Sequence, residues 1–272
     1  MKKFFVEKET DLKTFVSEKL KISKKKAKEI IDSKNVFVNN KRIWIATHNL
    51  KKGDIVEVVD FTAPKWNIEN SIIYEDEFII AVQKPPFLES ENKKGSVEDL
   101  LRKYKKDQKI KAIHRLDRET SGVLLFAKNN KIFEKFKELW HKKEVEKKYL
   151  AISHNEASFK KKVINEPIDK KYAKSIIKTL KTRNGFSLFE VEIKTGRKHQ
   201  IRRHLKKAGF PIVGDKTYGL KKVDHPLLKN VKRQMLHASS LSFFHPFLKR
   251  KITIKAKPFS DFEVFGKSVK LL

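Results

Sequence analysis

The apolar segments of this chain are mostly short, and their lengths and spacing are those of β-strands. Continuous or period-two apolar runs occur at GVLLFAK (122–128), KKYLAIS (147–153), FSLFEVEI (186–193) and KITIKA (251–256). Helical spacing lies between such runs, as in KIFEKFKELW (131–140). Strands and helices do not alternate as a regular βαβ series. The pattern therefore predicts an α+β fold, with a mixed, mostly antiparallel sheet and flanking helices.

The first 60 residues carry a pattern of their own. Helical spacing predicts one helix over 11–20 and a second within 22–33, with Ser23 as its N-cap. A hairpin follows in VFVNNKRIWI (36–45), around two asparagines. A charge run on a helix is usually a solvated face, and the alternative is a surface that binds phosphates. The second helix has such a run on its polar face: Lys24, Lys25 and Lys28.

This N-terminal pattern of two helices and a hairpin ends in V-x-V-N-x with a later G-D-x-V. It resembles the RNA-binding domain named after small-subunit ribosomal protein four. The resemblance implies that residues 1–60 form a small α+β RNA-binding domain that contacts RNA through those three lysines. Residues 61–71 contain a proline and polar residues without periodicity, which predicts a linker. Residues 72–272 then form the second domain.

The charge of the chain is strongly positive. Lys and Arg number 64 against 33 Asp and Glu, a formal net charge of +31. Residues 1–60 hold 15 basic and 9 acidic side chains, and the remainder hold 49 and 24, so the excess is not a detachable tail. Such a field attracts polyanions, with nucleic acid first and an anionic membrane surface second. A lysine-rich genome composition is the alternative explanation.

Several classes of protein are disfavoured by what the sequence lacks. It has no cysteine, hence no disulfide and no thiolate chemistry. No apolar run approaches the roughly 20 residues of a membrane span, and the start turns acidic at Glu7, unlike a signal peptide. We therefore expect a cytoplasmic protein that does not act on membranes.

Metal and cofactor motifs are also missing. His199 and His204 are five residues apart, which does not match the four-residue spacing of a zinc-binding helix. No G-x-G-x-x-G, phosphate-loop or G-x-S-x-G pattern occurs. We expect chemistry without a metal or a cofactor.

The remaining chemical group is a carboxylate among arginines. Asp117 lies in HRLDRETSG (114–122), and GRKHQIRRHLKKAGFPIVGD (196–215) supplies Arg202 from a predicted helix. If Arg202 reaches Asp117, it would hold that carboxylate fixed in direction, able to act as a nucleophile or base on a polyanion. A purely structural ion pair is the alternative.

The longer stretch HRLDRETSGVLLFAK closely resembles the catalytic motif of the RluA-type pseudouridine synthases. Further blocks follow in that family's order: IIYEDEFIIAVQKP before it, then EKKYLAI, TGRKHQIRRHLKKAGFPIVGDKTYG and RQMLHASSLSFFHP. The resemblance covers nearly all of residues 72–262. It implies a pseudouridine synthase that isomerises uridines in RNA. The N-terminal domain makes large-subunit ribosomal RNA the expected substrate.

The resemblance also implies roles for individual residues. Asp117 matches the aspartate that drives breakage of the glycosidic bond, by attack on the sugar, attack on the base or removal of a sugar proton. Tyr149 matches the tyrosine against the target base, and Arg202 the arginine that pairs with the aspartate. Arg115 matches the side chain that fills the vacated place in the RNA. The residues for which the resemblance implies contact with the substrate are His114, Arg115, Thr120, Arg197, His199 and Gln200.

Two departures and two alternatives remain. The loop KPPFLESENKKGS (84–96) differs from the family pattern, and Lys198 stands where the family has threonine. The same chemistry on transfer RNA is one alternative function, and a non-catalytic RNA-binding assembly factor is another. We expect a monomer.

Overall fold

The computed structural model describes residues 2–32, 36–39, 41–58, 66–220, 227–228 and 231–272. The chain divides into two compact units, Met1–Trp66 and Asn67–Leu272. The boundary falls within the segment 61–71 that we predicted as a linker. Of that segment, 61–65 lies outside the described residues, and Glu69–Ser71 forms a short 3₁₀ helix, η1.

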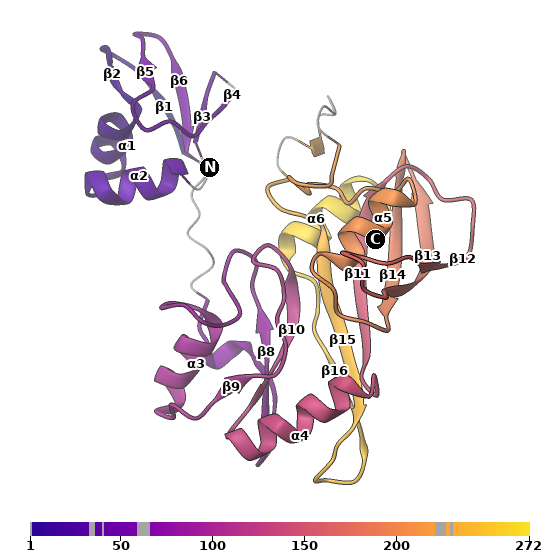
Figure 1. Ribbon diagram of the computed structural model, residues 1–272. Helices are drawn as coiled ribbons and strands as arrows, with labels where there is room; N and C mark the ends of the chain where they lie inside the picture. Colours follow the sequence, from indigo (N-terminus) through magenta and orange to yellow (C-terminus); the bar gives the residue numbers. More distant parts are fainter. Residues whose placement is uncertain (1, 33–35, 40, 59–65, 221–226, 229–230) are drawn as a thin grey trace. The chain divides into compact units, whose positions relative to one another are not determined.

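The first unit packs two helices against small antiparallel sheets (Figure 1). The sheets have the orders β1-β6-β3-β4 and β2-β5. Ser23 Oγ accepts the N–H of Lys26 at 3.2 Å, which confirms the predicted cap. Of the predicted hairpin, Asn40 lies outside the described residues. The elements are β1 (Lys2–Phe5), β2 (Thr10–Asp11), α1 (Leu12–Leu20), α2 (Lys24–Asp32), β3 (Val36–Val38), β4 (Lys41–Ile43), β5 (Asn49–Leu50) and β6 (Ile55–Val58).

The core of this unit follows from the helical spacing. Leu12, Phe15 and Val16 on α1 and Ala27 and Ile31 on α2 are buried, because these positions repeat every three to four residues. The polar face of α2 is left in solvent, and its lysines are exposed.

The second unit is built on one sheet of ten strands. Its order is β12-β13-β14-β11-β15-β10-β8-β7, with β16 paired to β15 and β9 to β10. Every pairing among its described strands is antiparallel except that of β10 with β15. The predicted mixed, mostly antiparallel α+β fold is confirmed. The strands are β7 (Ile72–Glu75), β8 (Ile79–Lys84), β9 (Lys111–Ala112), β10 (Ser121–Ala127), β11 (Glu146–His154), β12 (Lys161–Asn165), β13 (Lys174–Arg183), β14 (Phe186–Ile193), β15 (Leu236–Phe244) and β16 (Lys251–Lys255).

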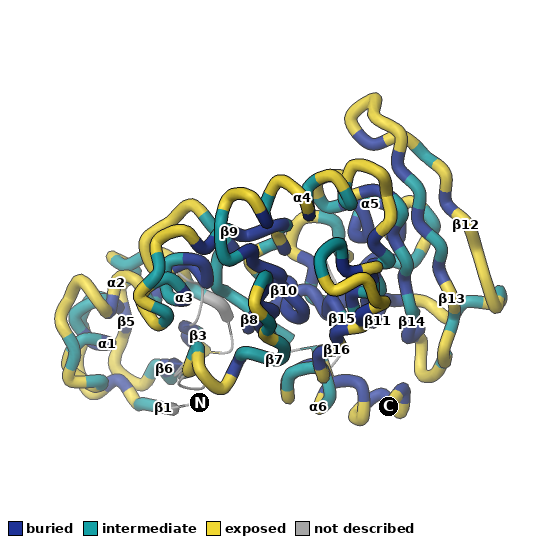
Figure 2. Tube along the Cα trace, turned by 90° about the horizontal axis from the view of Figure 1, so that it is seen from below, coloured by how far each residue is buried: buried dark blue, intermediate teal, exposed yellow. Residues whose placement is uncertain are grey.

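Four helices cover this sheet: α3 (Val97–Lys105), α4 (Asn130–His141), α5 (Gln200–Lys207) and α6 (Ser260–Ser268). Ile132 and Phe136 of α4 enter a core with the side chains of β8, β10, β15 and β16. All seven residues of β10 are buried, and Figure 2 shows this strand dark along its length. The centre of the sheet is therefore a rigid base for the segments at its ends.

Among the described residues, no helix combines the length and apolarity that crossing a bilayer requires. Within the same residues, no group of three or more His, Asp or Glu side chains is arranged to hold a metal ion.

Candidate active site

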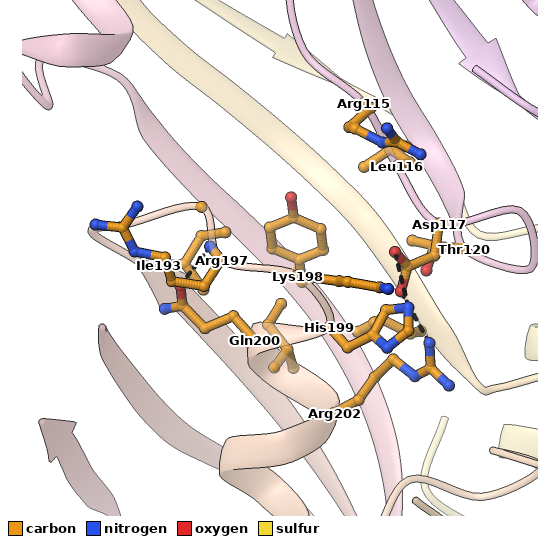
Figure 3. A pocket seen from close by; sticks show the side chains of 14 residues that line it. Arg115, Leu116, Asp117, Thr120, Ile193, Arg197, Lys198, His199, Gln200 and Arg202 are labelled. Carbon is orange, nitrogen blue, oxygen red and sulfur yellow. Dashed lines mark hydrogen bonds and ion pairs between the residues drawn. The ribbon is translucent and has the colours of Figure 1, made fainter. Parts of the chain in front are cut away.

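A cavity of about 440 Å³ lies in the second unit, within the size range of ligand pockets. Its walls come from the segment before β10, from β11 and from the segment that leads into α5 (Figure 3). Three stretches that are distant in sequence thus meet here. Eight of the nine site residues predicted in this unit line the cavity: Arg115, Asp117, Thr120, Tyr149, Arg197, His199, Gln200 and Arg202.

The segment that carries Asp117 is held by the divergent loop after β8. Ser90 Oγ bonds both the N–H and the carbonyl of Leu116, each at 3.0 Å. Lys84 is fully buried, and its Nζ donates to the carbonyls of Pro85, Leu88 and Arg118. Burial lowers the pKa of Lys84 to about 7. The loop that departs from the family pattern therefore positions the Asp117 segment.

The far end of the same segment is fixed by the one parallel strand pair. Ser121 and Gly122 of β10 pair with His237 and Ala238 of β15. Gly122 has φ +121°, and a Cβ at this position would meet the carbonyl oxygen of Ala238 at 2.1 Å. Only glycine fits here, because the strands approach closely in a conformation that side chains rarely adopt.

Asp117 is paired with Arg202, as we predicted. Arg202 Nη1 donates to Asp117 Oδ2 at 3.1 Å, across 85 residues of sequence. The Asp117 side chain is 31% exposed toward the cavity, whereas that of Arg202 is 8% exposed. The carboxylate is thus held by Arg202 on one side and exposed to the cavity on the other (Figure 3).

Asp215, which was not among the predicted site residues, orients the guanidinium of Arg202. Its carboxylate accepts Nε at 2.6 Å and Nη2 at 2.8 Å, which leaves Nη1 for Asp117. Burial acts to raise the pKa of Asp215, but Arg202 and the backbone N–H groups of Tyr218 and Thr217 outweigh it and lower that pKa. Burial acts to lower the pKa of Arg202, and the two carboxylates outweigh it and raise it. Arg202 and Asp215 are therefore both ionised.

Tyr149 comes to the cavity from the middle of β11. The register of β11 against β15 shifts between Lys148 and Tyr149, and such bulges re-aim side chains beside functional sites. Burial, with a smaller contribution from Asp117, raises the pKa of Tyr149, so its phenol stays neutral. The ring forms an apolar wall among charged groups.

His199 caps α5 in the left-handed conformation, with φ +54°. Its Nδ1 bonds the hydroxyl of Tyr218 at 3.2 Å, and its Nε2 lies 3.8 Å from Asp117 Oδ1, beyond hydrogen-bond distance. Burial lowers the pKa of His199 against the attraction of Asp117, so the ring is neutral near pH 7. The Arg202 guanidinium also lies over the Tyr218 ring, 5.0 Å from its centroid. Tyr218 was not predicted as a site residue.

Gln200 and Arg197 are committed to the shape of the segment before α5. The Gln200 side chain accepts from Thr195 Oγ1 and Arg197 N, and donates to Lys174 O and Ser175 Oγ. These four bonds use the whole amide, so Gln200 shapes the cavity wall. Arg197 Nε donates to Tyr172 O at 2.9 Å, and its guanidinium lies at the edge of the cavity, away from Asp117 (Figure 3).

Arg115, Thr120 and the three lysines differ in where they lie. Arg115 is 74% exposed at the side of the cavity, and its nearest described carboxylate, on Glu91, is 4.0 Å away. Thr120 is buried, and its hydroxyl accepts from Gln234 Nε2 at 2.5 Å. Lys24, Lys25 and Lys28 belong to the first unit.

His114 is the one predicted site residue of this unit that does not line the cavity. Its ring stacks on Trp140 at 5.3 Å between centroids, and its Nε2 accepts the N–H of Leu125 at 3.2 Å. Burial lowers the pKa of His114 to about 3. It anchors the Asp117 segment to α4 and β10, and the substrate contact predicted for it stays a prediction.

Comparison with known proteins identifies relatives of this chain. The family model of RNA pseudouridylate synthases matches residues 78–207. The ribosomal large subunit pseudouridine synthase C of Buchnera aphidicola subsp. Baizongia pistaciae is 34% identical over 267 residues, covering 84% of this chain and 83% of that protein. An uncharacterized RNA pseudouridine synthase of Helicobacter pylori is 38% identical over 236 residues, covering 81% and 88%.

A solved structure shares the fold. Human RNA pseudouridylate synthase domain containing 4 superimposes with a TM-score of 0.65 at 22% identity, covering 75% of this chain and 94% of that one. The fold, the family match and the two relatives point to one conclusion: this chain belongs to the RNA pseudouridylate synthase family and is an RNA pseudouridine synthase.

Proposed function

We propose that this enzyme isomerises specific uridines in large-subunit ribosomal RNA, with Asp117 as its catalytic carboxylate. The observation that carries the proposal is the Asp117–Arg202–Asp215 chain: a carboxylate fixed by a buried arginine, itself fixed by a buried aspartate. A purely structural ion pair does not require a carboxylate that is accessible from a cavity, whereas 31% of the Asp117 side chain is exposed there. The choice of RNA is supported by the Buchnera relative, whose name specifies the large ribosomal subunit.

The reaction begins with extrusion of the target uridine from the RNA. A base within a stack cannot reach a carboxylate in a cavity, and flipping it costs a few kcal/mol. Arg115 is exposed at the side of the cavity, and its planar guanidinium can stack on the bases that remain. We assign Arg115 to the vacated position in the RNA.

Inside the cavity, the uracil lies against Tyr149 and the glycosidic bond lies at Asp117. Asp117 drives the break between the sugar and the base nitrogen; the uracil then turns and rejoins the sugar through carbon. The neutral Tyr149 ring offers a stacking face without hindering this turn. Arg202 stays ionised throughout and keeps Asp117 in place.

The N-terminal unit is proposed as a separate RNA-binding domain of the type named after small-subunit ribosomal protein four. Lys24, Lys25 and Lys28 are exposed on one helix, and lysines bind phosphates without reading sequence. The enzyme would act as a monomer, and in the cytoplasm, since that is where ribosomal RNA is found in bacteria such as the relatives.

Mapping pseudouridines in RNA from living cells tests the substrate. Ribosomal and transfer RNA would be isolated from cells that lack this protein and from the same cells carrying the wild-type or the Asp117→Asn gene. We expect one or more pseudouridines of large-subunit RNA to be absent without the protein, restored by the wild type, and absent with Asp117→Asn. Loss confined to transfer RNA would overturn the assignment to ribosomal RNA.

A further inference from the structure

An exposed tyrosine stands beside the cavity with a cation over its ring. Tyr172 lies in the segment between β12 and β13 and is 49% exposed. Lys143, in the turn that follows α4, places its Nζ 5.2 Å from the centroid of the Tyr172 ring. An exposed aromatic ring can stack on a base, and a cation beside the ring can bind a phosphate of the same strand.

The position of Tyr172 is fixed relative to the cavity wall. Arg197, which lines the cavity, donates from Nε to Tyr172 O at 2.9 Å. Two residues further on, Lys174 donates its N–H to Thr195 Oγ1 at 3.1 Å, and its carbonyl accepts from Gln200 Nε2 at 3.0 Å. Tyr172 is therefore attached to the segment Thr195–Gln200, which forms the side of the cavity opposite to Arg115 in Figure 3.

The charges around this ring suit a nucleic-acid backbone. Lys143 and Arg197 are exposed, and none of the ion pairs in the described part of the chain involves either side chain. The next residue of the wall, Lys198, lines the cavity and, in Figure 3, directs its amino group toward Asp117. An RNA strand that enters here meets cations for its phosphates and an aromatic face for a base.

We propose that Tyr172, flanked by Lys143 and Arg197, is a stacking site for an unpaired base that neighbours the uridine held in the cavity. The inference rests on the proposed function in that the uridine is flipped into this cavity. The ring supplies stacking that is independent of base identity, and the two cations bind the phosphates on either side. The site thereby selects targets in single-stranded loops, because a base in a duplex cannot present its face.

The chain contains a matched control. Tyr104 on α3 is 41% exposed, and Lys105 places its Nζ 5.5 Å from that ring. Neither residue lines the cavity, and Lys105 is paired with Glu75 at 2.6 Å. The two tyrosines thus share their residue type and a similar exposure, but they differ in attachment to the cavity and in the ion pairing of the neighbouring lysine.

The test measures binding of a fluorescein-labelled single-stranded octamer of uridine by anisotropy. We expect Tyr172→Ala to weaken binding by about 5- to 150-fold, which corresponds to the usual loss of one stacked base. Tyr172→Phe should bind as the wild type does, and so should Tyr104→Ala. Equal affinities of Tyr172→Ala and Tyr104→Ala would overturn the proposal.

A second measurement does not depend on how the variant folds. An octamer that contains 5-iodouridine would be photocross-linked to the wild-type protein and to Asp117→Asn, and the linked peptide identified by mass spectrometry. We expect a cross-link at Tyr172 in both proteins, and linkage only elsewhere would contradict the site. Failure of Asp117→Asn to lower pseudouridine formation would reject the proposed function but would leave the cross-link result unaffected, so the two failures are distinguishable.

Discussion

At the scale of single residues, the site depends on how the N–H groups of one guanidinium are shared between two carboxylates. Asp215 accepts hydrogen bonds from Nε and Nη2 of Arg202, and Asp117 accepts one from Nη1. The buried carboxylate fixes the plane of the guanidinium, and that plane sets the direction of the exposed carboxylate. Asp215 is thus a positioning residue, and it acts on the chemistry through Arg202.

Asp215→Asn should damage both stability and rate. Asparagine offers one acceptor and turns an N–H₂ toward the guanidinium, so the buried cation loses the more buried of its two carboxylate partners. We expect the free energy of unfolding to fall by about 3–5 kcal/mol, together with a lower kcat in the fraction that remains folded. Urea unfolding and pseudouridine formation would be measured on the same preparation.

The neighbouring pair Arg203–Asp169 provides the control for that substitution. Asp169 accepts from Arg203 Nη1 at 2.9 Å, but its side chain is 65% exposed. Asp169→Asn should change the free energy of unfolding by less than about 1 kcal/mol, because solvent screens such pairs. If both substitutions lower the free energy of unfolding by the same amount, Asp215 has no special role in stability.

At the scale of elements, the parallel contact between β10 and β15 fixes the end of the Asp117 segment. Gly122→Ala would place a methyl group 2.1 Å from Ala238 O, in a backbone conformation that disfavours side chains. We expect a loss of roughly 3 kcal/mol or more in the free energy of unfolding, from strain and overpacking together.

Gly185→Ala separates those two contributions. Gly185 also has a positive φ, +78°, but nothing lies within 4 Å of a Cβ built there. Its substitution should lower the free energy of unfolding by the conformational strain alone, about 1–2 kcal/mol. Equal losses for the two glycines, measured by urea unfolding, would show that the close approach of β10 and β15 is unimportant.

Periodicity predicted those elements whose buried side chains repeat regularly. It identified β10, which is buried along its whole length, and α4, which buries one face. It missed β13, whose second half runs beyond the core and is largely exposed, and β15, whose buried residues include the polar His237 and the small Ala238. Hydrogen bonds satisfy the polar groups of β15, and no sequence pattern reports such bonds.

The site was predictable only through the catalytic motif. Residue types alone favoured a structural ion pair between Asp117 and Arg202, because spacing does not bring together side chains that are 85 residues apart. Asp215 gave one signal that we did not use: an acid that follows the apolar run Pro211–Val213 is buried and needs a cation. His114 was assigned from its place beside Arg115, whereas packing against Trp140 decides its orientation.

At the scale of the whole molecule, the positive charge should make RNA binding strongly dependent on salt. Replacing Lys24, Lys25 and Lys28 together with glutamine should lower the affinity for the RNA substrate and reduce the slope of log K against log salt by about 2–3. Lys26→Gln is the control, since Lys26 is paired with Glu29 at 2.9 Å. An unchanged slope in the triple variant would argue against the N-terminal unit as a phosphate-binding surface.

Acid should destabilise the protein well before its carboxylates are protonated. Burial lowers the pKa of five histidines in the second unit: His114, His199, His204, His237 and His245. The pKa is lowered to about 3 for His114 and to about 4 for His237. The unfolded chain binds more protons than the folded one below about pH 6.5, so stability falls as the pH decreases from there.

Urea unfolding at a series of pH values checks this expectation. The free energy of unfolding should decrease steadily from about pH 6.5 toward pH 4. His237→Asn should flatten the curve, whereas substitution of the exposed His141 should not. A wild-type curve that is flat over this interval would contradict the buried, neutral state of these rings.

The central claim is that the Asp117 carboxylate performs the isomerisation and is not merely part of an ion pair. Its most direct test uses RNA labelled with tritium at C5 of uridine, because a new bond to this carbon releases the label to water. With RNA from cells that lack the protein, the purified wild type should release tritium. Asp117→Asn should release it on the order of 10³-fold more slowly or not at all, while binding the RNA at least as tightly. A release rate for Asp117→Asn within tenfold of the wild type would contradict the account.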